Sequence, residues 1–232
     1  MKSRPRPPES PAMAALRRPA RRALASAAFC ALALGACAQR PAPRAAVPPP
    51  RPAATASLVG QLLVAGEDGA AGRGVVFLEN LAEPAPRSAE TSVKLEHLRG
   101  RLVPSFSAAP RGSSLSIENR DAIYHAAFSL SQPGGFSFRA YAPGARVGLR
   151  LDRPGVIRIY CRIHEGESAT IFVAPGPLAR MSRDGHFAFR DVPAGRFLLG
   201  AWADGGASAS REITLHAGER ARHDLLLVPE AE

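Results

Sequence analysis

The sequence contains few cysteines and shows almost no helical periodicity. Only three cysteines occur among its 232 residues, so a fold held together by several disulfides is excluded. No segment after residue 37 repeats apolar side chains with a helical period for more than a turn or two, which excludes a helical bundle. Glycine (21 residues) and proline (22 residues) are abundant instead, and both favour turns and strand ends.

The chain also lacks a basic stripe, although its formal net charge is +10. Residues 1–37 hold seven basic residues and one acidic residue, which leaves 23 basic and 19 acidic residues in the rest of the chain. A nearly neutral folded part offers no continuous surface for phosphates. We therefore do not expect nucleic acid to be a partner.

The N-terminal region has the pattern of a targeting segment. In residues 13–37, four arginines precede an apolar run from Ala23 to Ala36 that is short for a membrane span and ends in small residues. The string Leu34-Gly35-Ala36-Cys37 resembles a bacterial lipobox. We predict a signal peptide at 1–37 with lipidation at Cys37, and a protein of the periplasm or cell envelope that a lipid anchors to the membrane. Ordinary cleavage near Ala38 and a retained anchor remain alternatives.

Processing would leave a single thiol in the mature chain. Cys30 and Cys37 belong to the targeting segment, so only Cys161 remains beyond it, and no intramolecular disulfide can form. A lone thiol in an oxidising compartment is a liability unless it is occupied, and a metal is the usual occupant. Residues 38–57, rich in proline and alanine, are predicted to be a semi-extended linker.

Short apolar runs separated by turn strings occupy the chain from Leu58 onward. Turn strings such as QPGG, DRPG and VPAG recur between these runs. Many short strands at regular spacing predict an all-β fold, either a sandwich or a barrel. The expected strands are 58–64, 75–80, 147–151, 155–160, 169–173, 187–189, 196–202, 211–215 and 224–228.

Three residues of the central region have the chemistry of a metal site. Cys161 ends an expected strand, His164 follows three residues later, and His125 lies 36 residues before the cysteine. Two imidazoles and one thiolate make the trigonal ligand set of a type 1 copper site. The remaining histidines, His97, His186, His216 and His223, are interpreted as surface residues.

Residues 111–176 contain a set of short strings in a fixed order: Gly112, Asn119, Asp121, YHAAFSLS, FSFRAYAPG, LDRPGVIRIYC and CRIH. With these strings the region resembles the plastocyanin- and amicyanin-type cupredoxins, and especially the exported cupredoxin-like proteins often labelled methylamine-utilisation proteins. The resemblance implies a Greek-key β-sandwich at 91–175, with His125, Cys161 and His164 as copper ligands.

Two positions depart from the pattern of that family. Glu167 stands where the family usually has methionine, and Ala126 stands where it usually has asparagine. If Glu167 is the fourth ligand, it should stabilise Cu(II), lower the reduction potential and move the spectrum from blue towards red copper. Alternatively, Glu167 faces water and the axial position is empty or filled by a backbone carbonyl. Glu165 and Met181 are weaker candidates for this position.

A second module flanks the central region. The string SRDGHFAFRDVPAGRFLL at 182–199 resembles the carboxypeptidase-regulatory-like, or transthyretin-like, β-sandwich, and the opening of that pattern occurs near 59–78. We predict one small sandwich split into 58–90 and 176–229 around the central insertion. Two consecutive domains with an irregular N-terminal hairpin are the alternative. The module shows no catalytic triad, phosphate loop or pair of acids, and the analogy of fold alone supplies no substrate. We expect no enzyme, because one mononuclear copper without a second copper site gives no obvious position for a substrate.

The resemblance to cupredoxins implies an exported, monomeric one-electron carrier. Its expected partner is a cytochrome or an oxidoreductase that binds transiently, and a solvent-near His164 would be the electron port. One alternative is a copper-binding or copper-trafficking protein without redox turnover. Another is a metal-free β-sandwich binding lipoprotein that keeps only the fold.

Overall fold

A computed structural model describes residues 54–65, 74–82 and 91–228 of the chain. This part contains strands and no helix, which confirms the predicted all-β fold. Accordingly, none of its segments is a helix long and apolar enough to cross a membrane. The predicted signal peptide, Cys37 and most of the predicted linker lie outside the described residues.

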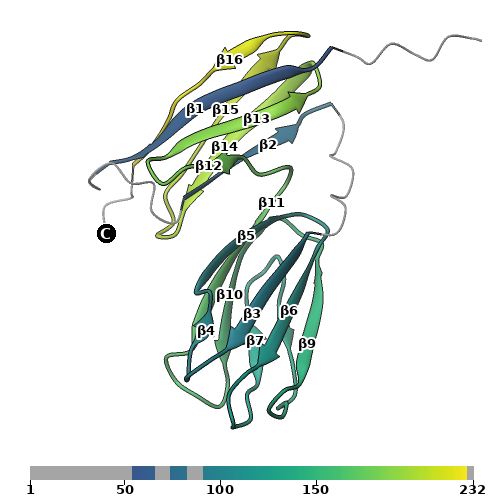
Figure 1. Cartoon of the computed structure of the whole chain (residues 1–232), viewed down its shortest axis with the longest axis vertical. Helices are drawn as coiled ribbons and strands as arrows, with labels where there is room; N and C mark the ends of the chain where they lie inside the picture. The colour runs from purple at the N-terminus through teal and green to yellow at the C-terminus, as the bar shows by residue number, and fades with distance from the viewer. Residues whose placement is uncertain (1–53, 66–73, 83–90, 229–232) are drawn as a thin grey trace, which may run out of the picture. The chain divides into compact units, whose positions relative to one another are not determined.

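Strands from the two ends of the described chain pair with each other (Figure 1). One sheet has the order β12-β13-β1-β16, with β17 also pairing with β1, and a second sheet has the order β15-β14-β2. The strands are β1 (Ala56–Val64), β2 (Gly74–Asn80), β12 (Arg180–Met181), β13 (His186–Val192), β14 (Gly195–Ala203), β15 (Ser208–Leu215), β16 (Arg220–Arg222) and β17 (Leu225–Leu227).

The strands between Ser92 and Ala174 pair only among themselves within the described sheets. Their two sheets have the orders β5-β11-β10-β7-β8 and β4-β3-β6-β9, and the pairs β3–β6 and β5–β11 are parallel. These strands are β3 (Ser92–His97), β4 (Leu102–Val103), β5 (Phe106–Pro110), β6 (Ser113–Asn119), β7 (Ala127–Ser129), β8 (Phe136–Ser137), β9 (Arg146–Leu151), β10 (Gly155–Cys161) and β11 (Ser168–Ala174).

Alternating side chains place the core between these two sheets. In β6, every second residue from Ser113 to Asn119 is buried, so Leu115 and Ile117 point inward. Ile157 and Ile159 of β10 and Ile171 of β11 belong to the same apolar cluster. Backbone pairing between neighbouring strands fixes the positions of the residues at the strand ends.

The first strand begins earlier than the sequence predicts. Ala56 and Ser57 were assigned to the linker, but both belong to β1. Ala56 is 2% exposed, and the Ser57 N–H donates to the Glu219 carbonyl at 2.9 Å. The small residues here carry little local strand preference, so pairing with distant strands decides their conformation.

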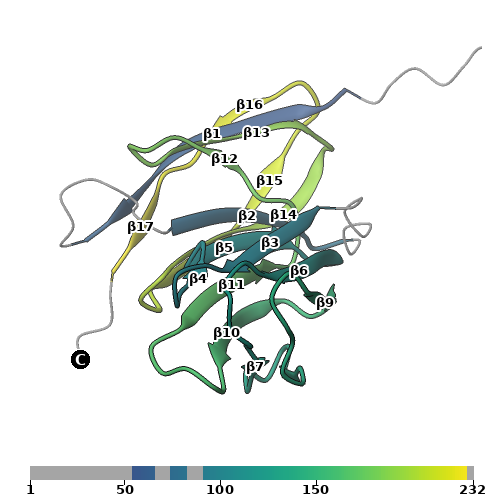
Figure 2. The same ribbon diagram turned by 60° about the horizontal axis from the view of Figure 1, so that its bottom comes forward.

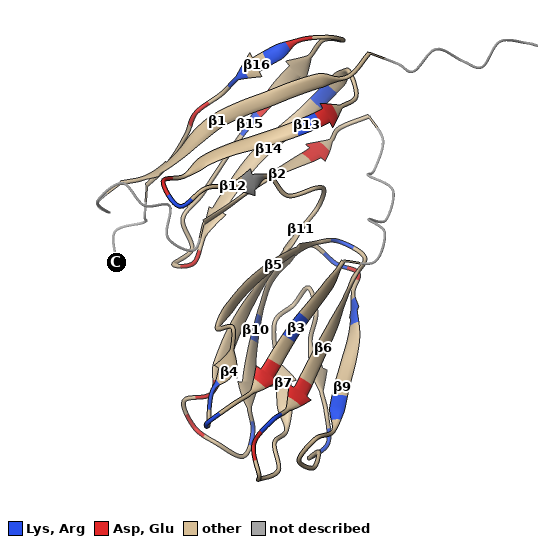
Figure 3. Ribbon diagram, in the orientation of Figure 1, with Lys and Arg blue, Asp and Glu red and all other residues tan. Residues whose placement is uncertain are grey.

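Charges of both signs are interspersed over the strands (Figure 3). On the outer side of the β3–β6–β9 sheet, for example, Glu118 pairs with both Arg146 and Arg120. Arg146, by its hydrogen bond and its charge, holds the pKa of Glu118 below its ordinary value. Such paired surface charges give no single-sign patch of the kind that phosphates require.

Candidate metal site

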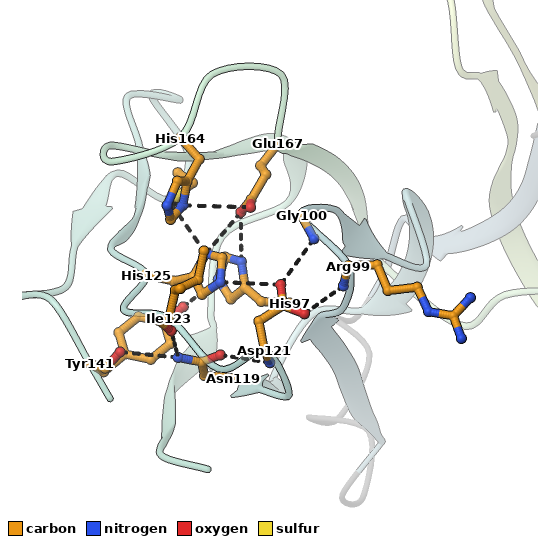
Figure 4. Close-up of polar contacts among 11 residues, drawn as sticks. His97, Arg99, Gly100, Asn119, Asp121, Ile123, His125, Tyr141, His164 and Glu167 are labelled. Carbon is orange, nitrogen blue, oxygen red and sulfur yellow. Dashed lines mark hydrogen bonds and ion pairs between the residues drawn. The ribbon is translucent and has the colours of Figure 1, made fainter. Parts of the chain in front are cut away.

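Four potential metal ligands converge near the end of β10: His125, Cys161, His164 and Glu167. Figure 4 shows the polar contacts around them. Each offers one ligand atom, and these atoms all lie within 4.8 Å of one another. Cys161 is the last residue of β10, and His164 and Glu167 lie in the loop that leads to β11. His125 lies between β6 and β7, and Ala127 of β7 pairs directly with Cys161. Figure 2 turns this end of the β7–β10 pair towards the viewer.

The distances among these atoms suit one metal ion. The Cys161 Sγ lies 3.7 Å from the Nδ1 of His125 and 3.6 Å from the Nδ1 of His164. Metal–nitrogen bonds of about 2.0 Å and metal–sulfur bonds of about 2.3 Å would separate the two donors by about 3.5–3.7 Å at tetrahedral to trigonal angles. The two imidazoles and the thiolate therefore have the spacing of a shared coordination sphere.

The Glu167 carboxylate completes the cluster from inside the protein. Its Oε2 lies 3.1 Å from the His125 Nδ1, and its Oε1 lies 3.6 Å from the His164 Nδ1. The Glu167 side chain is only 1% exposed, so the alternative in which it faces water is wrong. Glu165 is exposed, and Met181 packs against the core of the sheets formed by the chain ends, so neither residue belongs to the cluster.

A buried oxygen without a partner supports a metal at this position. Glu167 Oε1 is buried and has no hydrogen-bond donor in the described structure. A buried carboxylate oxygen is costly unless a donor or a cation satisfies it. A cation held by the other three donors would satisfy it, and a thiolate with two imidazoles is a donor set suited to copper.

Backbone hydrogen bonds fix the cysteine and the upstream histidine. The Cys161 N–H donates to the Glu167 carbonyl at 3.2 Å, which closes the ligand loop on itself. The Arg162 N–H donates to the Ala126 carbonyl at 2.9 Å and ties that loop to the His125 segment. His125 and Tyr141 exchange two backbone hydrogen bonds, of 3.2 and 2.8 Å. The ligand positions are therefore set by main-chain pairing rather than by flexible side chains.

The Asp121 carboxylate lies beside the His125 ring nitrogen that does not belong to the ligand cluster. Its Oδ2 lies 3.3 Å from the His125 Nε2, at ion-pair distance but without hydrogen-bond geometry. Burial would raise the pKa of Asp121, but N–H donors of Gly100 and Arg99, together with His125, hold that pKa below its ordinary value. The Asp121 carboxylate thus stays charged beside the His125 Nε2, and a proton on that nitrogen would leave the Nδ1 lone pair for a metal.

Asn119 joins the three chain segments behind the site. Its Nδ2 donates to the carbonyls of Ile123 (2.7 Å) and Tyr141 (3.2 Å), and its Oδ1 accepts from the Asp121 N–H at 3.0 Å. The residue is fully buried. One side chain therefore holds the turn that carries His125 against the segment that carries Tyr141.

We expect Asn119→Ala to loosen this turn. The substitution leaves the Ile123 carbonyl and the Asp121 N–H without the Asn119 side chain, whereas the Tyr141 carbonyl keeps the His125 N–H. Each buried group left unsatisfied costs about 1–3 kcal/mol. The melting temperature should fall by at least several degrees, measured by circular dichroism on the metal-free protein. An exposed substitution, Ser137→Ala, serves as the control, and an equal melting temperature for both variants would contradict this role of Asn119.

His97 is buried, and its interpretation as a surface residue is wrong. It is 0% exposed, with Nδ1 at 2.8 Å from the Glu167 Oε2 and Nε2 at 2.6 Å from the Tyr141 hydroxyl. Its ring stacks on that of His125 at 4.0 Å between centroids. Burial lowers the pKa of His97, although its hydrogen bond to Glu167 opposes the shift. Burial, with the nearby charges of Cys161 and Glu167, raises the pKa of Tyr141.

The strand pattern carried a signal for His97. In β3, Val93, Leu95 and His97 share the buried face, because every second residue points inward. A histidine that continues an apolar alternation is expected inside. His186 and His216 are exposed and His223 is half-buried, unlike His97.

Apolar side chains beside the two histidines are open to solvent. Ile163, next to His164, is 49% exposed, and Ile123 and Tyr124, just before His125, are 50% and 57% exposed. The His164 side chain is itself 30% exposed, whereas that of His125 is fully buried. His164 therefore provides the candidate site with its contact to the surface.

Comparison with known proteins gives structural neighbours but no family. No protein-family model and no curated protein matches the chain. A purple cupredoxin from Nitrosopumilus maritimus is 19% identical, with 35% of this chain and 99% of that chain covered and a TM-score of 0.33. A mutant of amicyanin in the Cu(I) form is 12% identical, covering 44% of this chain and 98% of that one, with a TM-score of 0.34.

An enzyme also occurs among the neighbours. A copper-containing nitrite reductase from Thermus scotoductus is 21% identical, with 40% of this chain covered and a TM-score of 0.34. This chain spans only 25% of that protein. At such identities and TM-scores these similarities assign no activity to this chain.

Proposed function

We propose that this chain is an exported copper protein that carries one electron at a time through a mononuclear site. The observation that supports the proposal is the convergence of the His125 Nδ1, the His164 Nδ1 and the Cys161 Sγ in a largely buried position. Thiolate suits Cu(I) and imidazole suits both oxidation states, so this mixture holds copper through a redox cycle.

The bound copper would supply the one-electron chemistry, and the protein would supply a fixed environment. Main-chain hydrogen bonds hold Cys161 and the segment of His125, so the ligands need little rearrangement when the charge of the metal changes. The buried Glu167 adds a negative charge that favours the oxidised ion. The partly exposed His164 gives the shortest covalent route from the metal to solvent.

The apolar surface beside His164 suits brief contact with a redox partner. Ile163, Ile123 and Tyr124 expose large apolar side chains without a surrounding block of one charge sign. A small apolar contact permits rapid association and release, as electron-transfer partners need. In this proposal the partner is a cytochrome or an oxidoreductase, and the protein is a monomeric lipoprotein of the cell envelope.

A second function is favoured by one observation. Glu167 is anionic, buried and within the cluster, and a carboxylate beside a thiolate stabilises Cu(II) more than Cu(I). A strong enough preference would make the protein a store or carrier of copper ions without redox turnover. The strength of the preference that Glu167 gives to Cu(II) therefore decides between an electron carrier and a copper-trafficking protein.

The test is copper titration followed by voltammetry on the purified exported protein. We expect one copper per chain, an intense thiolate-to-copper absorption band and a reversible one-electron wave over repeated cycles. If copper binds and gives the band but no reversible wave, copper trafficking is favoured over electron transfer. Absence of stoichiometric binding would overturn both and favour the metal-free β-sandwich.

A further inference from the structure

We propose that His97 is a positioning residue that orients the Glu167 carboxylate and leaves Oε1 as the oxygen with unused capacity for a metal. This inference rests on the proposed copper site. It concerns the buried histidine that lies outside the ligand cluster and yet touches two of its members (Figure 4).

Both ring nitrogens of His97 are engaged. Nδ1 lies 2.8 Å from the Glu167 Oε2, and Nε2 lies 2.6 Å from the Tyr141 hydroxyl oxygen. An ionised carboxylate only accepts hydrogen bonds, so the neutral ring must carry its proton on Nδ1 and donate it to Oε2. Nε2 then accepts from the Tyr141 O–H. This assignment pairs both ring nitrogens of His97, the Tyr141 hydroxyl and the Glu167 Oε2 with no extra proton.

The two oxygens of Glu167 are therefore different. Oε2 accepts the N–H of His97 and also lies 3.1 Å from the His125 Nδ1, whereas Oε1 is buried without a hydrogen-bond donor. A hydrogen bond to one oxygen restrains rotation of the carboxylate and reduces the electron density available to a metal from that oxygen. Oε1 is left as the atom with unused capacity, and it faces His164 at 3.6 Å from Nδ1.

Backbone pairing holds His97 in a fixed position. It ends β3, where it pairs with Asn119 of β6, and its carbonyl accepts the Arg120 N–H at 2.9 Å. Glu167, by contrast, lies in the loop just before β11. The strand ladder thus holds the donor while the ligand sits on a loop, so the hydrogen bond transmits the rigidity of the strand to the carboxylate.

The stacking of His97 on His125 offers a competing explanation. The two rings lie 4.0 Å apart at 20°, so removal of His97 could disturb the site through His125 instead of Glu167. A double substitution separates the two routes. If His97 acts through the carboxylate, its effect must vanish when Glu167 is already alanine.

The first measurement needs no copper. Nitrogen-15 spectra of the histidine rings in the metal-free protein should show His97 protonated on Nδ1, with a slowly exchanging proton. The resonance should shift or exchange rapidly in Glu167→Ala. A His97 ring protonated on Nε2 in the intact protein would overturn the proposal, whatever the outcome of copper binding.

The second measurement is the copper spectrum and potential of His97→Phe and His97→Asn. Phenylalanine keeps an aromatic ring against His125 but removes the donor, and the asparagine amide can replace the Nδ1–H donor. We expect His97→Phe to favour Cu(II) over Cu(I) by at least about tenfold, a fall in potential of about 59 mV, with altered copper hyperfine splitting. His97→Asn should stay within about threefold of the intact protein, as expected for a role that the donor alone fulfils.

The decisive comparison is His97→Phe in the Glu167→Ala background. We expect no further change of spectrum or potential there, and an undiminished change would overturn the proposal in favour of the stacking route. Failure of the intact protein to form a thiolate-to-copper band would instead refute the proposed function. The metal-free spectra would still decide the role of His97 in that case.

Discussion

The intense visible band of the copper-loaded protein is expected to disappear completely in Cys161→Ser. The band arises from charge transfer between a thiolate and Cu(II), and Cys161 provides the thiol of the cluster. A serine hydroxyl is a harder and weaker donor, so the affinity for Cu(I) should fall more than that for Cu(II). Absorption and paramagnetic-resonance spectra, with competition for copper by chelators specific for each oxidation state, measure both effects.

The fold should survive this substitution. Cys161 is 8% exposed at the end of β10, and placing a hydroxyl there costs about 1–3 kcal/mol. The metal-free variant should therefore melt within about 12 °C of the intact protein. The exposed His186→Gln in β13 is the matched control and should leave the spectrum unchanged. A band that persists in a folded Cys161→Ser would mean that another group binds the copper.

The sequence was sufficient to name the four residues that the structure brings together, although their role as ligands remains a prediction. Cys161 ends β10 and His164 lies three residues later, so their proximity is local. His125 is distant in sequence, but it comes near because β7 follows it and pairs with β10 at Ala127 and Cys161. The resemblance to cupredoxins had implied that His125 joins the other two residues. It remains a prediction that the two histidines and the cysteine bind the metal and that Glu167 is the fourth ligand.

His97 could not be placed without knowledge of sheet order. It reaches the site because β3 pairs in parallel with β6, a contact between segments that no short turn connects. The strand itself, SVKLEH, carries a lysine and a glutamate on its outer face, which weakened its strand signal. The alternation of Val93, Leu95 and His97 indicates that these side chains share one face of the strand. Only the pairing of β3 with its neighbours shows that this face points into the core.

The very short strands were also beyond prediction. β4, β8 and β12 have two residues each, too few for any period to be recognised. They form because a longer neighbour offers unpaired backbone groups, as β3 does for β4 at Glu96 and His97. Local sequence fixes the alternation of long strands, whereas pairing across the sheet creates the short ones.

Replacing Glu167 should raise the reduction potential. With the thiolate and the carboxylate bound, Cu(II) forms a neutral cluster, whereas Cu(I) leaves one net negative charge on a site whose carboxylate is 1% exposed. Removal of the carboxylate charge makes the Cu(I) cluster neutral, so the buried negative charge no longer destabilises the reduced state. We expect Glu167→Gln to favour Cu(I) by at least about tenfold relative to the intact protein, a rise of about 59 mV or more by voltammetry.

Comparison of glutamine with methionine at position 167 separates charge from ligand type. Glu167→Met supplies a soft thioether and removes the hydrogen bond from His97, so its potential should exceed that of Glu167→Gln and its spectrum should move towards blue copper. Glu165→Gln, two residues away in the same loop and exposed, is the matched control for loss of a carboxylate near the site. If Glu165→Gln raised the potential as much as Glu167→Gln, the effect would be that of a distant charge, and Glu167 would not be a ligand. If only the variants at position 167 respond, the buried carboxylate itself sets the balance between electron transfer and retention of Cu(II).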